Sequence, residues 1–234
     1  MSWNILETKA ASAEENMQLD AKLLENLEGQ ERPILHLYEW ERESATFGYF
    51  VRPEDLLNLS EARNRGLDLA RRPTGGGVVF HLWDLAFSVV VPAKSKLFSS
   101  NTLDNYNLVN RVVKEVVKAF SGVLEEVELT PDDAPFRNQT CTHFCMARPT
   151  KYDVMLQGKK IAGAAQRKTK DGFLHQGTIA LLRPDPELLG AVLPSEAVRE
   201  AMMKTTFPLL KEARELQEGR RELCEHLKRQ FSKL

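Results

Sequence analysis

Three closely spaced segments with strand character, residues 152–157, 160–167 and 173–182, constrain the fold of this 234-residue chain most strongly. The first two flank Gly158-Lys159, a pair that suits a two-residue hairpin turn. We therefore expect three consecutive antiparallel strands in this part of the chain.

The rest of the chain alternates between strand and helix patterns. "VVFH" and "LAFSVVVP" predict two adjacent strands, and further strands are expected in residues 33–40 and 67–72. Helices are predicted at 12–29 behind a capping box of Ser12 and Glu15, at 52–66, and at 102–121 with Leu108, Val112, Val116 and Ala119 on one face. Strands in hairpins with helices between them predict an α+β domain, a largely antiparallel sheet flanked by helices.

The chain length allows one large domain with a small appendage, and we expect a main domain at residues 1–200 with a C-terminal helical extension, residues 201–234, packed on it. The net charge of −1 gives no reason to expect nucleic acid or an anionic membrane as partner. No apolar run approaches the roughly 18 residues that span a bilayer. The N-terminus does not resemble a secretory signal, and three cysteines indicate reduced thiols, so we expect a cytoplasmic protein.

A glycine-rich turn, "RRPTGGGVVFH" at residues 71–81, is the first candidate site. Gly75, Gly76 and Gly77 allow backbone N–H groups to approach a carboxylate or phosphate, because no Cβ intervenes. Arg71 and Arg72 add fixed positive charge that suits an anionic head group. A flexible hairpin loop is the alternative. The turn is not a P-loop, because no Lys-Ser/Thr pair follows the glycines.

The second arm of the hairpin begins with Lys160 and continues with small residues. Simple alternation places Lys160, Ala162, Ala164 and Gln166 on one face, with Ile161, Gly163 and Ala165 on the other. A long side chain followed by small ones leaves a groove for an extended acyl chain, with its carbonyl against the ammonium. The alternative is a solvated lysine, which burial statistics normally favour. Exposed strands, however, favour larger β-branched residues.

A cysteine pair, Cys141 and Cys145, surrounds His143 in "CTHFC". Structural zinc needs four ligands, and no second Cys/His pair lies nearby in the sequence, so we expect no metal here. A buried inert thiol is the usual role of a single cysteine. Cys145 lies in a basic stretch, however, and such a positive field favours the nucleophilic thiolate.

Three motifs together resemble one family. "RRPTGGGVVFH", "GKKIAGAAQRK" and "LHQGTIAL" are similar, in this order, to the catalytic domain shared by biotin and lipoate protein ligases and octanoyltransferases. The resemblance covers roughly residues 30–190. It implies an enzyme that attaches lipoate or octanoate to a lysine, with Lys160 at the acyl carbonyl. It also implies acyl and head-group contacts at Arg71, Arg72, Thr74, Gly75, Gly76, Gly77, His81, Gly163, Ala164, Gly177 and Thr178.

The branch within the family is indicated by a fourth segment. "CMARPTKYDV" is similar in spacing to the "CFxxPSxYE" segment of cysteine-dependent octanoyltransferases, whose nucleophile falls on Cys145. "TGGG" is instead the ligase form, since the closest transferases have arginine at the position of Gly77. Ligases usually carry Asn-Asp where this chain has Tyr152-Asp153. A cysteine-dependent transferase is slightly favoured over an ATP-dependent lipoate ligase, and a non-catalytic acyl-binding relative is a third reading.

Each reading implies its own partners. The transferase needs no cofactor, whereas the ligase needs ATP and magnesium, with Asp153 as a possible magnesium ligand. The acceptors implied are lipoyl domains of 2-oxoacid dehydrogenase complexes or glycine cleavage H protein. The donor implied is an acyl carrier protein or free lipoate. Seven Lys and Arg between residues 148 and 170 suit an acidic carrier domain or a phosphopantetheine donor.

Overall fold

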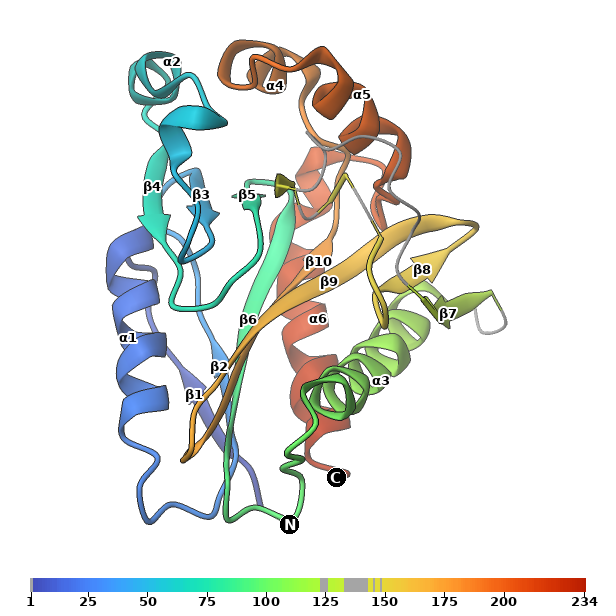
Figure 1. The fold of residues 1–234 in the computed structure, drawn as a ribbon. Helices are drawn as coiled ribbons and strands as arrows, with labels where there is room; N and C mark the ends of the chain where they lie inside the picture. The colour runs from blue at the N-terminus through green and yellow to red at the C-terminus, as the bar shows by residue number, and fades with distance from the viewer. Residues whose placement is uncertain (1, 123–125, 133–142, 145, 148) are drawn as a thin grey trace.

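A seven-stranded sheet forms the centre of the molecule, which is a computed structural model describing residues 2–122, 126–132, 143–144, 146–147 and 149–234 (Figure 1). Its strand order is β1-β2-β6-β10-β9-β8-β7. The strands are β1 Asn4–Glu7, β2 Ile34–Leu37, β6 Asp84–Pro92, β7 Val127–Leu129, β8 Val154–Leu156, β9 Lys159–Lys168 and β10 Gly172–Ala180. Every neighbouring pair is antiparallel except β1 with β2. The predicted α+β class with a largely antiparallel sheet is confirmed.

A second, three-stranded sheet consists of β4 (Asp68–Arg71), β3 (Ser44–Phe47) and β5 (Val78–His81), in that order. The prediction that "VVFH" and "LAFSVVVP" form adjacent strands is wrong, because β5 belongs to the small sheet and pairs with β3, whereas β6 pairs with β2 and β10 in the large sheet. The two residues between β5 and β6 carry the chain from one sheet to the other.

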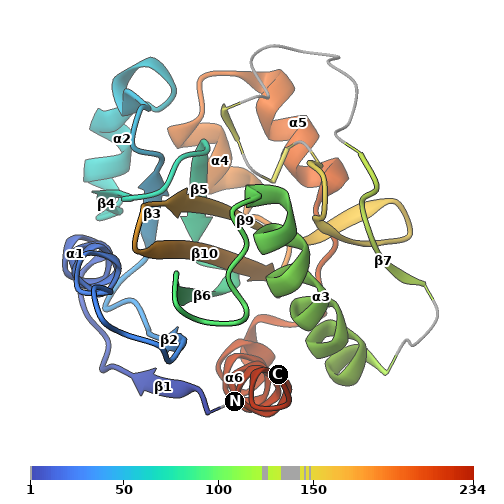
Figure 2. The same cartoon turned by 60° about the horizontal axis from the view of Figure 1, so that its bottom comes forward.

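Helices cover both faces of the large sheet (Figure 2). α3 (Thr102–Ser121) and α6 (Leu216–Phe231) pack on one face, and α1 (Ala13–Glu25) packs on the other. α2 (Leu59–Asn64), α4 (Pro186–Val192) and α5 (Glu196–Thr205) form a separate cluster with the small sheet. The predicted capping box of Ser12 and Glu15 is present at the start of α1.

Two predicted helices differ in detail from the structure. The segment 52–66 forms a short 3₁₀ turn, Pro53–Asp55, followed by α2, rather than one helix. In α3, Val112 and Val116 are buried as predicted, but Leu108 is half-buried and Ala119 is exposed. The buried stripe instead includes Val109, Val113 and Val117, which follow the 3.6-residue period more closely.

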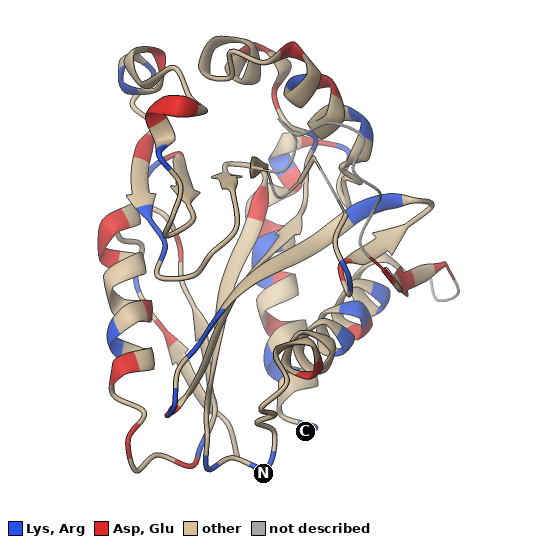
Figure 3. Cartoon of the chain, in the orientation of Figure 1, with Lys and Arg blue, Asp and Glu red and all other residues tan. Residues whose placement is uncertain are grey.

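The C-terminal helix α6 belongs to the main core. Leu223, Leu227 and Phe231 are fully buried beside the inward valines of α3. The domain boundary at residue 200 stays a prediction. Both signs of charge are mixed along α1, α3 and α6 (Figure 3). No helix in the described part of the chain is long and apolar enough to cross a membrane.

Candidate active site

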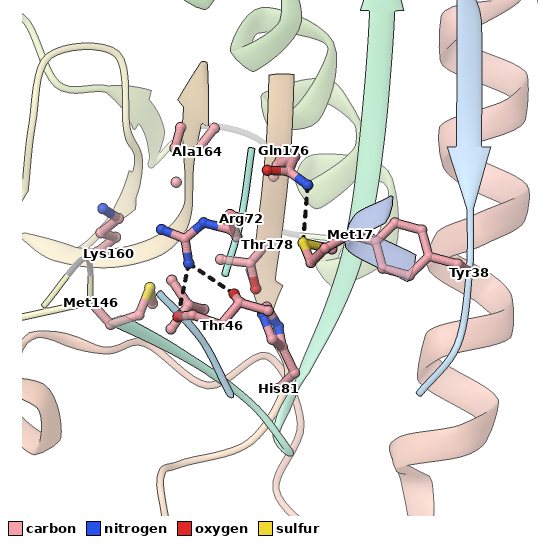
Figure 4. A pocket seen from close by; sticks show the side chains of 14 residues that line it. Met17, Tyr38, Thr46, Arg72, His81, Met146, Lys160, Ala164, Gln176 and Thr178 are labelled. Carbon is pink, nitrogen blue, oxygen red and sulfur yellow. Dashed lines mark hydrogen bonds between the residues drawn. The ribbon is translucent and has the colours of Figure 1, made fainter. Parts of the chain in front are cut away.

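A pocket lies between the two sheets (Figure 4). It encloses about 410 Å³ of space, part of it open to solvent, and its walls come from β9, β10, β3, β5 and α1. Seven of the predicted site residues line it: Arg72, His81, Lys160, Gly163, Ala164, Gly177 and Thr178. The structure thus brings together residues that are up to 106 positions apart, counted from Arg72 to Thr178.

Lys160 is buried at one end of this pocket. Its Nζ lies 2.6 Å from Oδ2 of Asp153, and both side chains are 3% exposed. The same carboxylate oxygen accepts hydrogen bonds from the backbone N–H of Thr150 at 2.6 Å and from its hydroxyl at 2.9 Å. A buried ammonium is costly unless it is paired, so this ion pair holds the lysine at the pocket. The alternative of a solvated hairpin lysine is wrong.

A β-bulge decides which side chains share the face of Lys160. Met155 pairs with Lys160 and Val154 pairs with Ala162, so Ile161 is an extra residue in β9. The hairpin turn also lies one residue earlier than predicted, at Gln157 and Gly158, which both have positive φ. The predicted alternation is therefore wrong, because Lys160 and Ala162 point to opposite faces.

Gly163, not Ala162, lies beside the lysine. A Cβ at residue 163 would be 2.3 Å from Cε and 2.5 Å from Nζ of Lys160. Gly163 pairs with Thr178 and Ala165 pairs with Gln176, so these four residues form the sheet surface of the pocket. Gly177 has its backbone at the pocket, whereas a Cβ there would meet Phe87 on the core side. The small residues at 163 and 165 leave a groove. The sequence predicted this groove with the other alternating set of residues, that of Ala162 and Ala164.

Arg72 organises the turn that follows β4. Its guanidinium is buried and donates to the backbone oxygens of Thr46, Gly75 and Gly77 at 3.0, 3.1 and 2.8 Å. It also donates to Oγ1 of Thr46 at 2.8 Å. A fixed fork of donors suits this role of holding several oxygens at once. Arg72 thus ties the glycine turn to the pocket wall.

Arg71 and the glycines lie outside the residues that line the pocket. Arg71 donates to the carbonyl oxygens of Tyr49 and Val51 at 2.6 and 2.8 Å, and its guanidinium covers the Phe47 ring. A Cβ at Gly77 would lie 1.9 Å from the backbone oxygen of His143. The close approach that requires this glycine is therefore to the protein's own backbone. Contact of the turn with a ligand head group stays a prediction.

His81 connects the two sheets through a chain of hydrogen bonds. Its Nδ1 lies 2.8 Å from Oδ2 of Asp84, and its Nε2 lies 2.8 Å from Oγ1 of Thr46. Thr178 donates to the same oxygen of Asp84. The indole of Trp40 stacks on the imidazole, with 4.4 Å between ring centroids. These contacts fix the His81 ring in one orientation on the wall of the pocket.

The end of the pocket opposite Lys160 is closed by residues that the sequence reading missed. Met17 and Tyr38 form this end (Figure 4). Gln176 accepts from Thr74 at 2.7 Å and donates to Oδ2 of the buried Asp20 at 2.6 Å. Burial and the charge of Asp20 raise the pKa of Tyr38 well above its usual value, so its hydroxyl stays neutral. Gln176 lies in the quoted motif "LHQGTIAL" but had no role assigned to it, and no short motif marks Met17 and Tyr38, which come from α1 and the end of β2.

The structure describes one of the three cysteines, Cys224. Cys141 and Cys145 lie outside the described residues. Cys224, on α6, is half-buried, and burial raises the pKa of its thiol to about 11. A thiol with this pKa is protonated at neutral pH and is a poor nucleophile. Cys224 lies away from the pocket and is not a candidate for covalent chemistry.

Within the described part of the chain, no three His, Cys, Asp or Glu side chains form a cluster that could hold a metal ion. The Lys160 ammonium and the Thr150 donors occupy Oδ2 of Asp153, which disfavours magnesium at that oxygen, and Asp153 as a magnesium ligand stays a prediction. A divalent cation at this carboxylate would be repelled by the adjacent ammonium.

Comparison with known proteins gives consistent matches over nearly the whole chain. Residues 12–227 match the family described as the lipoyl protein ligase A/B catalytic domain. The octanoyltransferase LipM of Brevibacillus brevis is 32% identical over 205 residues, which are 86% of this chain and 74% of that protein.

Two solved structures are similar in fold. A lipoate-protein ligase A bound with ATP superposes with a TM-score of 0.69 and 26% identity, over 100% of this chain and 85% of that chain. A bipartite lipoate protein ligase from Thermoplasma acidophilum, studied with its E2 lipoyl domain, superposes with a TM-score of 0.65 and 25% identity. That match covers 99% of this chain and 84% of the ligase chain.

Proposed function

Because the chain belongs to the lipoyl protein ligase A/B catalytic domain family, we propose that it transfers an octanoyl or lipoyl group to a lysine of a lipoyl domain. The named relatives are octanoyltransferases and two solved neighbours are lipoate protein ligases, and all of these are enzymes. The chain is accordingly an enzyme of protein lipoylation rather than a non-catalytic acyl-binding relative.

One observation carries the proposal: a buried ammonium ends a narrow pocket with small residues in its wall. Lys160 lies beside Gly163, and the pocket continues from there towards Met17 and Tyr38 (Figure 4). An eight-carbon acyl chain is extended and apolar, and it suits a groove lined by Gly163 and Ala165. Its carbonyl oxygen then lies at the ammonium, which stabilises the negative charge that develops there during acyl transfer.

The transfer proceeds in two steps if Cys145 is the nucleophile. In the first, the Cys145 thiolate attacks the carbonyl of a donor thioester, the carbon–sulfur bond to the donor breaks, and the donor leaves as a thiol after taking up a proton. In the second, the amine of the acceptor lysine attacks the new thioester. An amide forms, an amine proton is lost, and the Cys145 thiol is regenerated. Splitting the reaction in this way replaces one difficult step by two easier ones.

The contacts that the Asp153 carboxylate makes favour a transferase over an ATP-dependent ligase. Its carboxylate pairs with Lys160 and with Thr150, which does not suit magnesium binding. The named relatives at about 30% identity are octanoyltransferases. The ligase reading, with ATP and magnesium, remains the second candidate, because the solved ligase bound with ATP shares the fold over the full chain.

The partners follow from the reaction. The acceptor is a lipoyl domain, as supported by the solved ligase that was studied with its E2 lipoyl domain. Lipoyl domains of 2-oxoacid dehydrogenase complexes and the H protein of glycine cleavage are the proposed acceptors. An acyl carrier protein is the proposed donor, and free lipoate is the donor of the ligase alternative. We place this reaction in the cytoplasm.

The test separates the two readings. Enzyme incubated with octanoyl-carrier protein and no ATP should give a thioester on Cys145 that hydroxylamine cleaves, detected by mass spectrometry. Cys145→Ala should lose the adduct and the turnover, whereas Cys224→Ala should keep both, because its thiol is protonated. Full activity of Cys145→Ala with ATP and free lipoate would establish the ligase reading instead.

A further inference from the structure

A second, smaller cavity adjoins the pocket. The two share Val79, Met146 and Thr178 in their linings. On the same measure as the 410 Å³ pocket, this cavity encloses about 350 Å³ of space, part of it open to solvent. Its remaining walls are mainly apolar and come from Phe80, Trp83, Asp84, Ala180, Leu182, Pro184, Met202 and Thr206.

Two buried polar atoms of this lining have no hydrogen-bond partner among the described residues. They are Oδ1 of Asp84 and Oγ1 of Thr206, in side chains from residues that are 6% and 4% exposed. A buried polar atom without a partner destabilises the folded protein. Native proteins retain few such atoms, and two in one cavity indicate a group that pairs with both when it is bound.

The contacts of Asp84 leave one of its carboxylate oxygens without a hydrogen-bond partner among the described residues. His81 and Thr178 both contact its Oδ2, and Arg220 donates from Nε to its backbone oxygen at 2.8 Å. The orientation is therefore fixed by three elements, and Oδ1 is the unpaired acceptor. A carboxylate oxygen makes its strongest hydrogen bonds with a charged donor.

Thr206 is placed beside the reaction centre by the backbone. It forms an isolated bridge with Lys160, and the N–H of Phe207 donates to the backbone oxygen of Lys160 at 2.9 Å. Its hydroxyl accepts as well as donates hydrogen bonds. The cavity therefore combines a carboxylate and a hydroxyl next to the pocket that ends at Lys160.

We propose that this cavity binds the terminal amine of the acceptor lysine, with its methylene stem along the apolar wall. An ammonium has the size of a water molecule and three donors, which match Asp84 Oδ1 and Thr206 Oγ1. The stem of a lysine packs readily on apolar side chains such as Trp83, Leu182 and Met202. The inference rests on the proposed function, because it names where that function takes its second substrate.

Thr206→Val is the central test, since valine keeps the shape and removes only the hydroxyl. We expect kcat/KM for the lipoyl domain to fall about tenfold, while formation of the acyl-enzyme from the donor thioester is unchanged. Because an unpaired buried hydroxyl is removed, thermal stability should stay equal or rise. Thr205→Val is the matched control: its hydroxyl donates to the backbone oxygens of Met146 and Ala201, and the residue does not line the cavity.

Two further variants test the charge and the space. Asp84→Asn should weaken use of the lipoyl domain more strongly than use of the donor, because the amine loses its anionic partner. Ala180→Leu fills the cavity from β10 and should exclude the lysine while leaving acyl-enzyme formation intact. Equal effects of these variants on the donor and acceptor steps would overturn the proposal.

A small probe makes the inference independent of the reaction. n-Pentylammonium chloride should bind in the millimolar range by NMR titration and compete with the lipoyl domain but not with the donor. 1-Pentanol lacks the charge and should bind at least tenfold more weakly, and Thr206→Val should weaken the ammonium. If the wild type modifies no lipoyl domain, the proposed function fails while probe binding still reports on the cavity. A cavity that holds a water only would bind neither probe, and this result would refute the inference.

Discussion

Lys160 and Asp153 form a buried ion pair across the β8–β9 hairpin, with 2.6 Å between Nζ and Oδ2. Asp153 precedes β8, Lys160 follows the turn, and the extra residue Ile161 in β9 sets the face on which they meet. The carboxylate is itself held by Thr150. The pair therefore positions the ammonium at the pocket before any substrate enters, which reduces the reorganisation needed during transfer.

Removing one member of this ion pair should lower the free energy of unfolding more than replacing both members. Asp153→Ala leaves the Lys160 ammonium buried without this carboxylate, and we expect the free energy of unfolding to fall by about 3–5 kcal/mol. The double variant Asp153→Leu with Lys160→Met replaces the pair by apolar side chains and should recover most of this loss. Urea denaturation measures both.

Transfer activity separates stability from function in the same variants. The double variant should be stable but inactive towards the lipoyl domain, because no ammonium lies at the acyl carbonyl. A single Asp153→Ala variant as stable as the wild type would refute the role in stability, and an active double variant would refute the role in transfer.

The sequence predicted the main components of the fold because their signals are local. The hairpin from 152 to 182, the capping box of α1 and the stop of α3 at Gly122 each depend on residues that are close in the chain. Lys160 was likewise identifiable, because a charge before small residues in a strand pattern is unusual.

The predictions that were wrong, and the residues that were missed, depend on contacts between segments that are distant in the chain. The bulge at Ile161 changes the face of every residue before it in β9, and no glycine or proline marks it in the sequence. The pairing of Gln176 with Asp20 and the cavity between Asp84 and Thr206 join residues more than 120 positions apart, as the numbering shows. Such partners become visible only when the two sheets are placed against one another.

The glycine turn offers a matched pair of substitutions. A Cβ at Gly77 would lie 1.9 Å from the backbone oxygen of His143, whereas a Cβ at Gly75 meets nothing within 4 Å. Gly77→Ala should therefore displace the backbone near residue 143 and lower the melting temperature by several degrees, since about 1–3 kcal/mol of overpacking is expected. Gly75→Ala should be neutral in the same thermal scan. Equal melting temperatures for the two variants would contradict this packing.

Met17 should set the length of acyl chain that the pocket accepts. It is 3% exposed and lies at the end of the pocket opposite Lys160 (Figure 4). Met17→Ala should raise kcat/KM for decanoyl relative to octanoyl donors about tenfold, because two more buried methylenes contribute about 0.8 kcal/mol each. Met17→Trp should shift the preference to shorter chains. Met203→Ala, a methionine outside the pocket lining, is the control and should leave the profile unchanged.

The buried His175 should make the protein sensitive to acid. It lies between Phe87 and Tyr106, its Nδ1 contacts Gln166 at 2.7 Å, and burial lowers its pKa from 6.5 to about 3. Between these two pH values the unfolded chain binds a proton that the folded chain does not, so the free energy of unfolding decreases as the pH falls. The expected slope from this one group is about 1 kcal/mol per pH unit.

Substitution of this histidine isolates its share of the acid sensitivity. His175→Gln keeps an acceptor for Gln166 and removes the titrating ring, so the slope of stability between pH 6 and pH 4 should decrease by about 1 kcal/mol per unit. Urea denaturation of the wild type and of this variant at a series of pH values measures the slope. A slope that is unchanged in His175→Gln would show that the ring is already protonated in the folded protein.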